Sequence, residues 1–442
     1  MAKYQKYAEY QDSGVEWLGE IPKDWGVLKL KYAVDLISEK SQDINQKYVG
    51  MENITSKNGK YVHTEEVIPE GISNTFKDND VLFGKLRPYL AKSWLASFSG
   101  ICSSELLVLR AKEICPKFLQ YYTLTDEFIN QVDSSTYGSK MPRASWEFIS
   151  LLSIPKCSFD LSIKIANFLD HETAQIDTLI AKQEKLIELL KEKCQAVISH
   201  AVTKGLNINA LMKDSGVEWL GQVPEHWTVS RYKYCTSRVV VGIAEAATHA
   251  YSEKGIPIIR ATNIKEEGIN INDTLYLKES FANMNEGKYL YTNDIITVRT
   301  GYPGISAVIP ETLDKSHCFT NLVSTPKSSH CPHFLNEYLN SRMGKAYFAL
   351  FGWGSAQKNI SVPILQEFPI AYPELAEQKK IVVAVQNEKN KFNLLISNVQ
   401  NSIKLMQERR TALISAAVTG KIDVRNWQNP NNNNEAKTEF SA

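Results

Sequence analysis

The sequence predicts an α+β fold that is built twice: a tandem duplication of two α/β domains separated by two long helices that form an antiparallel coiled coil. Three observations carry this prediction. The octet DSGVEWLG occurs at 12–19 and again at 214–221, residues 165–205 align with 381–421 without a gap, and both middles contain short apolar runs and a helical stretch. A period of about 200 residues is too long for a solenoid repeat, so each copy is a domain.

Length and composition permit two cores and restrict the function only weakly. The 442 residues are 43% hydrophobic and 22% charged, which is typical of globular domains. The formal net charge of +1 neither requires nor excludes nucleic acid, because a basic groove can exist on a neutral protein. Seven scattered cysteines without metal-ligand spacing indicate reduced thiols, and no apolar run reaches the roughly 20 residues of a membrane span. We expect a cytoplasmic protein without a metal site.

The repeated octet predicts a short capped helical turn at the head of each copy. Ser13 with Glu16, and Ser215 with Glu218, have the spacing of a capping box, in which each side chain satisfies a free amide of the first turn. The glycine that closes each octet ends the turn. Its repetition indicates that both copies need the same local scaffold.

The divergent middle of each copy is predicted to form short strands around a helix. Residues 115–132 and 331–351 predict the helices, each with a proline in its first turn. Runs that are rich in apolar or β-branched residues and bounded by Gly, Asn, Asp or Pro predict strands at 48–54, 79–86, 103–111, 256–264, 293–301 and 321–327. Such an order is typical of a compact α+β domain.

The shared ends predict two helices about 60 Å long that pair with one another. Apolar residues recur every seven positions, with polar breaks at Gln183, Lys389 and Arg410. This spacing predicts a coiled-coil seam made by Leu169, Ile176, Ile180, Ile187, Leu190, Val197, Val385, Phe392, Ile396, Val399, Ile403, Met406 and Leu413. The alternative is two separate amphipathic helices, each lying on its own domain.

These elements divide the chain into five parts. The first α/β domain with its capped turn takes 1–156 and the first long helix takes 157–206. The second domain takes 207–372 and the second long helix takes 373–425. An Asn-rich tail that we expect to be disordered takes 426–442.

No catalytic constellation is recognisable in the sequence. Phosphate-binding loops of the GxxxxGK[ST] or GxGxxG kind, a GxSxG nucleophile motif and an NPPY-type methyltransferase tetrapeptide are all missing. Among the histidines only His330 and His333 lie close together, and a solvated turn explains them better than a metal site does. We therefore predict that the chain is a non-catalytic binding scaffold.

The frame SGVEWLGxxPxxW at the head of each half, the divergent middles, and the EQKKIVVAVQNE and ISxAVTxG stretches at the tails resemble the specificity subunit of Type I restriction and modification enzymes. The resemblance spans about 12–424. It implies two target-recognition domains, each reading one half of a bipartite asymmetric DNA sequence, and a helical pair that sets their separation.

The same resemblance implies the partners and cofactors. Double-stranded DNA, two modification subunits that methylate adenine, and restriction subunits with translocase and nuclease activity would bind this chain. S-adenosylmethionine, ATP and Mg would be held in those subunits, with no cofactor in this chain.

The residues that contact DNA have to be sought in the divergent middles. We chose basic, amide and aromatic residues in glycine-bounded loops after strands, where Arg or Lys can pair with guanine and Asn or Gln with adenine. The predicted DNA-binding residues are Lys85, Arg87, Tyr89, Ser139, Lys140, Arg143, Arg260, Asn263, Arg299, Tyr302, Gln357, Lys358 and Asn359. A solvated surface charge or a loop-bracing hydrogen bond is the competing interpretation of each.

Two other functions stay open at this point. One is a diverged DNA methyltransferase or nuclease, which would be active as the isolated chain. The other is a purely structural coiled-coil scaffold, which would be indifferent to DNA sequence.

Overall fold

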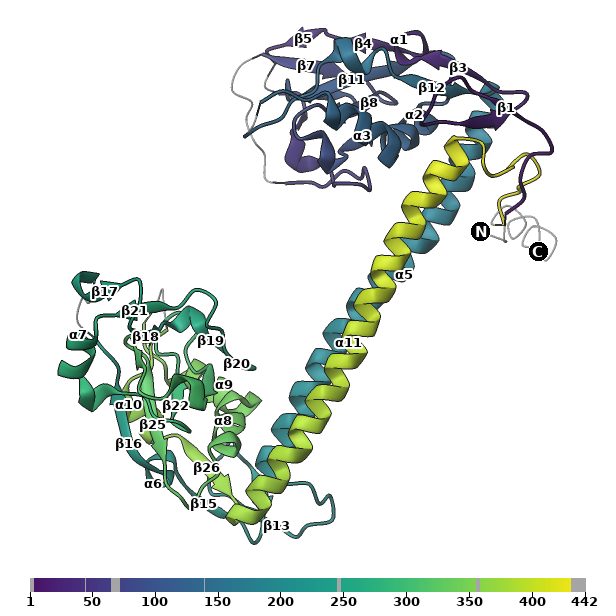
Figure 1. Ribbon diagram of the computed structural model, residues 1–442. Helices are drawn as coiled ribbons and strands as arrows, with labels where there is room; N and C mark the ends of the chain where they lie inside the picture. The colour runs from purple at the N-terminus through teal and green to yellow at the C-terminus, as the bar shows by residue number, and fades with distance from the viewer. Residues whose placement is uncertain are drawn as a thin grey trace. The chain divides into compact units, whose positions relative to one another are not determined.

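The chain forms two compact units (Figure 1). Unit 1 comprises 1–184 with 400–442, and unit 2 comprises 185–399. Each unit therefore contains one α/β middle and a part of both long helices. The computed structural model describes residues 4–43, 45–64, 72–138, 140–244, 248–354 and 358–430.

Unit 1 has a four-stranded antiparallel main sheet of order β4-β11-β8-β9 and a second sheet of order β5-β7-β10-β6. Its elements are β1 (Tyr10–Asp12), β2 (Glu20–Pro22), β3 (Gly26–Lys29), α1 (Leu30–Ala33), β4 (Val34–Ile37), β5 (Lys40–Ser41), β6 (Tyr48–Val49), η1 (Met51–Asn53), β7 (Ser73–Phe76), β8 (Val81–Gly84), η2 (Pro88–Leu90), β9 (Ser93–Leu95), β10 (Gly100–Cys102), β11 (Leu106–Ala111), α2 (Pro116–Thr123), α3 (Asp126–Ser134), α4 (Trp146–Ile149), β12 (Ser153–Lys156) and the start of α5 (Phe159–Lys204).

Unit 2 repeats this plan with sheets of order β16-β25-β22-β23 and β17-β21-β18-β24. Its elements are β13 (Met212–Asp214), β14 (Gln222–Pro224), β15 (Thr228–Arg231), α6 (Tyr232–Cys235), β16 (Thr236–Val241), η3 (Thr248–Ala250), β17 (Tyr251–Ser252), β18 (Ile256–Ile259), η4 (Ala261–Asn263), β19 (Ile264–Lys265), β20 (Gly268–Ile269), β21 (Leu275–Leu277), α7 (Glu279–Met284), η5 (Glu286–Lys288), β22 (Ile295–Thr297), β23 (Ser306–Val308), η6 (Glu311–Leu313), β24 (His317–Cys318), β25 (Leu322–Pro326), α8 (Pro332–Asn340), α9 (Arg342–Phe351), α10 (Val362–Gln366), β26 (Pro369–Tyr372) and the start of α11 (Leu375–Val418).

Each predicted middle helix is two helices in the structure. Thr125 interrupts 115–132 because its hydroxyl accepts the Phe128 amide and begins α3. Ser341 interrupts 331–351 in the same way, accepting the Gly344 amide at the start of α9. An N-cap inside an apolar run restarts the helix, and periodicity does not reveal this.

The two long helices pair antiparallel, as predicted. In unit 1 the start of α5 and the end of α11 share one core, with Asp177 bound to Arg410 and Lys164 to the Arg425 carbonyl. In unit 2 the end of α5 and the start of α11 share another. Every predicted seam residue is buried or half-buried, whereas Leu186 and Leu405, off the seam, are 40% and 65% exposed. The alternative of two separate helices is wrong.

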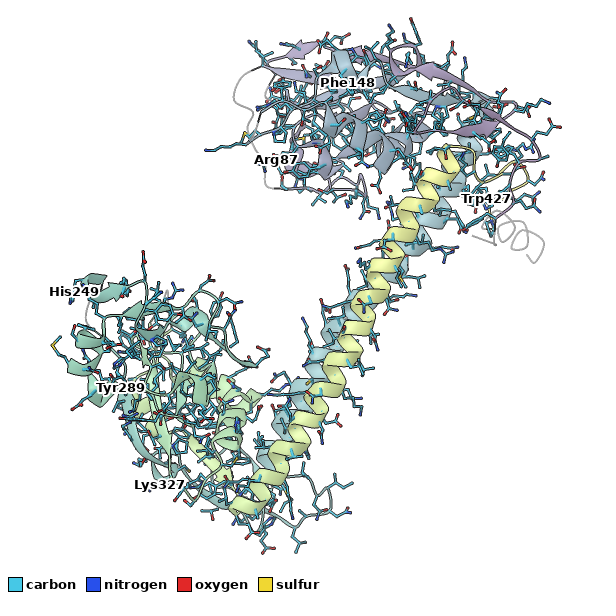
Figure 2. The ribbon with its side chains drawn as sticks, viewed as in Figure 1. Arg87, Phe148, His249, Tyr289, Lys327 and Trp427 are labelled. Atoms are coloured by element: carbon cyan, nitrogen blue, oxygen red, sulfur yellow. The ribbon has the colours of Figure 1, made fainter. Side chains whose placement is uncertain are left out.

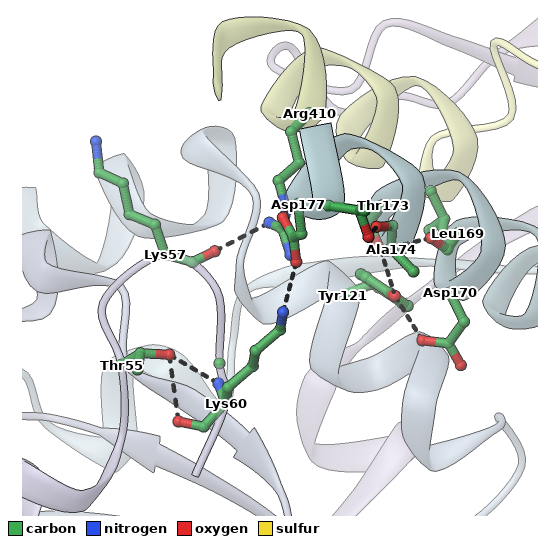
Figure 3. A network of polar contacts seen from close by, with 12 residues as sticks. Thr55, Lys57, Lys60, Tyr121, Leu169, Asp170, Thr173, Ala174, Asp177 and Arg410 are labelled. Carbon is green, nitrogen blue, oxygen red and sulfur yellow. Dashed lines mark hydrogen bonds and ion pairs between the residues drawn. The ribbon is translucent and has the colours of Figure 1, made fainter. Parts of the chain in front are cut away.

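Two of the polar residues that interrupt the seam, Arg410 and Lys389, join the α/β part of their unit to the long helices. The Arg410 guanidinium donates to Asp177 at 2.9 Å and to the Lys57 carbonyl at 3.3 Å, and Lys60 pairs with the same carboxylate at 2.7 Å (Figure 3). In unit 2 Lys389 pairs with Glu337 of α8 at 2.5 Å. The breaks therefore mark where each α/β part is fixed to a helix.

The octet forms the predicted turn, but the predicted capping box is wrong. The Ser13 hydroxyl accepts the Val15 amide and Asp12 accepts the Gly14 amide, and Ser215 and Asp214 repeat both bonds. Each serine amide donates to the carbonyl of the glycine that ends its octet, at 3.0 Å, so it is not available to the glutamate side chain. Both glutamates are exposed.

The tail prediction needs a correction at its start. Trp427 packs edge-on against Phe168 of α5, with ring centroids 5.7 Å apart. Val424 and Ile422 just before it lie in the unit 1 core. Residues 431–442 lie outside the described part of the chain.

Candidate nucleic-acid interface

Two loops of unit 1 meet beyond the end of strand β8. Arg143 forms β-bridges with Leu86 and with Tyr137, and the Tyr137 and Arg143 backbones exchange two hydrogen bonds of 3.1 Å. The Arg87 amide donates to the Pro142 carbonyl at 2.7 Å, and the Ala144 amide to the Lys85 carbonyl at 3.0 Å. We call residues 85–89 with 137–138 and 140–143 the loop pair of unit 1. The structure thus joins two loops that the sequence analysis singled out separately.

Unit 2 builds the same arrangement beyond strand β22. Asn359 forms β-bridges with Thr300 and Trp353, and the Ile360 amide donates to the Arg299 carbonyl at 3.0 Å. We call residues 299–303 with 353–354 and 358–359 the loop pair of unit 2. Gly138 and Gly354 follow the aromatic residue in each copy and both have a left-handed backbone, with φ of 92° and 109°. The YGS and WGS letters were the signal in the sequence for this equivalence.

The loop pairs carry exposed aromatic side chains. In unit 1 Tyr89 is 49% and Tyr137 is 63% exposed. In unit 2 Tyr302 is 81% and Trp353 is 58% exposed. Tyr137 and Trp353 were absent from the predicted residues. Exposed rings beside basic side chains suit contacts with nucleotides, because a ring can stack on a base or pack along the sugar-phosphate backbone.

The basic side chains of the unit 1 loop pair differ in how they are held. Arg87 and Lys140 are exposed and Lys85 is half-buried, and none of the three forms an ion pair within the described residues. Arg87 has a left-handed backbone with φ of 50°, a conformation that costs a non-glycine residue energy and is concentrated at functional sites. In Figure 2 Arg87 and Trp427 lie at opposite ends of unit 1.

Arg143 is held by a carboxylate from the start of β11. Its Nε donates to both oxygens of Glu105 at 3.1 Å, and its Nη2 donates to Oε1 at 3.0 Å. Hydrogen bonding to Glu105 raises the pKa of Arg143. Glu105 therefore orients a guanidinium that is still 37% exposed.

The polar residues of the unit 2 loop pair are held more weakly. The Asn359 carbonyl oxygen accepts the Thr300 hydroxyl at 3.2 Å, and the Lys358 ammonium donates to the Gly352 carbonyl at 3.3 Å. Arg299 is half-buried and Lys358 is exposed. Ser139 and Gln357, which the sequence also proposed, lie outside the described residues.

The burial of Asn263 corrects the sequence-based set of DNA-binding residues. Asn263 is 4% exposed; its carbonyl oxygen accepts the Arg260 amide at 2.9 Å, and its amide donates to the Asn270 carbonyl at 2.9 Å. The Arg260 guanidinium donates to the Asp273 carbonyl. Asn53 of unit 1 forms the equivalent bond with the Gly50 amide at 2.8 Å. Asn263 and Asn53 therefore each brace a 3-10 turn after a strand, and we remove the buried Asn263 from the candidate interface. Arg260 is half-buried and stays a predicted DNA-binding residue.

The described residues supply binding groups but no set of metal ligands. No group of three or more His, Cys, Asp or Glu side chains among them could hold a metal ion. His330 packs against Tyr372 and lies beside Gln378, which is a structural environment. Within the described helices none is long and apolar enough to cross a membrane.

The family model described as Type I restriction modification DNA specificity domain matches residues 245–405. The EcoDI specificity subunit of Escherichia coli is 21% identical over 190 residues, which cover 42% of this chain and 43% of that subunit. The MjaVIII specificity subunit of Methanocaldococcus jannaschii is 23% identical over 445 residues, which cover 92% of this chain and 95% of that subunit.

Two solved structures share the fold. A chain described in work on complex assembly and conformational transition of the type I R-M system has a TM-score of 0.69 at 17% identity, and covers 91% of this chain and 99% of its own length. The HsdS subunit of Thermoanaerobacter tengcongensis has a TM-score of 0.51 at 16% identity, with coverage of 91% and 98%.

Proposed function

We propose that this chain is a specificity subunit of a Type I restriction-modification complex. In that complex it would recognise a bipartite, asymmetric DNA sequence. Each unit would contact one half of the target through its loop pair. The chain would itself be non-catalytic.

One observation carries the assignment of one half-site to each unit. The two units share their fold, their octet and the backbone bridges of the loop pair, yet the side chains on the two loop pairs differ. A protein with two identical readers would recognise a palindrome, because symmetry-related surfaces contact symmetry-related half-sites. Two different readers on one repeated frame are suited to two different half-sites.

The repeated parts support the proposed partners. The octet turn has the same internal hydrogen bonds and the same exposed glutamate in both units. Two equivalent surfaces would accept two copies of one modification subunit, and restriction subunits would complete the complex. S-adenosylmethionine, ATP and Mg would belong to those subunits. The proposed cellular compartment is the cytoplasm.

Methylation mapping tests this function. This chain would be co-expressed with its modification subunit in a host that lacks adenine methylation, and modified adenines would be located across the genome. We expect one bipartite, asymmetric motif. The absence of a motif, with a modification subunit that is active with another specificity chain, would contradict the proposal and favour a structural scaffold. Methyl transfer by the purified chain alone would favour a diverged methyltransferase instead.

A further inference from the structure

We propose that one equivalent position in the two loop pairs, Arg143 in unit 1 and Asn359 in unit 2, discriminates a base pair in each half-site. Arg143 would contact a guanine and Asn359 an adenine. This inference rests on the proposed function and assigns a base chemistry to each unit.

The backbone shows that the two positions are equivalent. Each residue forms β-bridges with a residue after a main-sheet strand and with an aromatic residue that precedes a glycine: Leu86 and Tyr137 for Arg143, and Thr300 and Trp353 for Asn359. The next residue in each copy donates its amide to the carbonyl of a basic residue, Lys85 or Arg299. The frame at this position is therefore the same in both units.

The side chain at this position is what differs, and the fold does not require either version. In unit 1 Glu105 holds a guanidinium, whereas in unit 2 Thr300 holds a carboxamide. Because the same bridges form around both residues, the ion pair in unit 1 is not needed to build the loop pair. A position with a kept backbone and a changed polar group is suited to reading different bases.

Within the described residues, the bonds to Glu105 leave Arg143 with its guanine-binding edge available. The carboxylate occupies Nε and one side of Nη2. The edge formed by Nη1 and the other side of Nη2 faces away from Glu105, and this edge can donate two parallel hydrogen bonds to the O6 and N7 acceptors of guanine. Holding one edge of the guanidinium reduces the rotamer freedom that the side chain loses on binding.

Asn359 has the complementary chemistry for adenine. Its carboxamide presents an acceptor and a donor side by side, which match the N6 donor and N7 acceptor of adenine in the major groove. The Thr300 hydroxyl occupies one lone pair of the Asn359 carbonyl oxygen at 3.2 Å, and that oxygen can accept a second bond. The half-buried position limits the rotation of the amide.

The test uses the whole complex and compares methylation motifs. Arg143→Gln removes the guanidinium, and Asn359→Ala removes the amide. We expect Arg143→Gln to relax one guanine position in one half-site, and Asn359→Ala to relax one adenine position in the other. The loss of discrimination at each position should be roughly 10- to 100-fold. Glu105→Gln should weaken the same guanine preference with the guanidinium still present. Lys23→Gln, which removes an exposed pair with Glu9, is the matched control.

Each outcome separates this inference from the proposed function. A wild-type bipartite motif that is unchanged in both variants would overturn the inference and leave the function standing. A uniform fall in methylation at every site with the motif intact would also overturn it, because that result indicates a phosphate or structural contact. If Arg143→Gln gives no methylation at all, Arg143→Lys decides, because its ammonium can still donate to guanine. Restored methylation with the guanine position kept supports the inference. Restored methylation without a guanine preference at that position, or no methylation from either variant, would overturn it.

Discussion

The guanidinium of Arg410 donates to the Asp177 carboxylate at 2.9 Å, across the two long helices within unit 1. The two side chains are only 8% and 17% exposed. Lys60 from a loop of the α/β part reaches the same carboxylate, and the Lys57 carbonyl accepts a second bond from Arg410 (Figure 3). A break in the apolar seam is therefore the point at which three segments of unit 1 are joined.

Removing Arg410 should destabilise unit 1 strongly. Arg410→Ala leaves Asp177 in a nearly buried position with Lys60 as its remaining cation, and we expect a loss of about 3 kcal/mol, at the lower end for a broken buried pair. Denaturant unfolding measures it. Lys404→Ala, which removes an exposed pair with Glu408, is the control and should change stability by less than about 0.5 kcal/mol. An equal effect of the two variants would contradict the anchoring role.

The seam should be far more sensitive to truncation than the outer faces of the helices. Leu169 is fully buried in the unit 1 core, so Leu169→Ala should cost about 2–5 kcal/mol through lost burial and a cavity. Leu405 on the same helical pair is 65% exposed, and Leu405→Ala should cost less than about 0.5 kcal/mol. Thermal unfolding of both variants makes the comparison, and similar losses would argue against the seam.

Asn263 should affect stability without affecting DNA reading. Asn263→Ala leaves the Arg260 amide without its acceptor in a partly buried turn, which costs about 1 kcal/mol. The methylation motif of the complex should stay unchanged. Asn272→Ala, at an exposed site nearby, should change neither property. A relaxed motif from Asn263→Ala would return this residue to the interface.

The sequence predicted the repeated parts better than the divergent ones. The seam and the starts of α5 and α11 follow from a periodic pattern that one apolar stripe imposes on a whole helix. The end of the second helix was predicted at 425, but α11 ends at Val418, and Ile422 and Val424 pack in the unit 1 core without a helix. The partners of Arg410 and Lys389 could not be predicted, because they come from residues far away in the sequence. Asn263 was misassigned because an amide after a strand looks the same whether it braces a turn or reads a base.

The contacts that form the loop pairs could not be predicted from the sequence either. The sequence selected Arg143 and Asn359 from their loop composition, but the bridges to Leu86 and Thr300 depend on long-range folding. Glu105 carries no local signal at all, since an acidic residue before a strand is ordinarily a solvated charge. Glu105 can hold Arg143 only because β11 pairs with β8, and this pairing between distant segments brings Glu105 beside the loop pair of unit 1.

Unit 2 should lose stability as the pH falls below about 6.5 because of His317. This side chain is fully buried and stacks on Tyr289 at 4.4 Å, and burial lowers the pKa of His317 below its ordinary value of 6.5. The unfolded chain takes up a proton first, so stability is retained above pH 6.5 and falls below it. Melting temperatures across this range should fall less steeply in His317→Gln. His63→Gln, at an exposed site, should keep the wild-type slope.

Exchange of one middle tests the central claim most directly, which is that each unit reads its own half of the target. Residues 33–155 would be replaced in the full chain by the equivalent segment of a specificity subunit with a different target, and adenine methylation by the proposed complex would be mapped. We predict that one half-site changes to that of the donor and the other half-site stays the same. A motif that changes in both halves, or in neither, would contradict the claim.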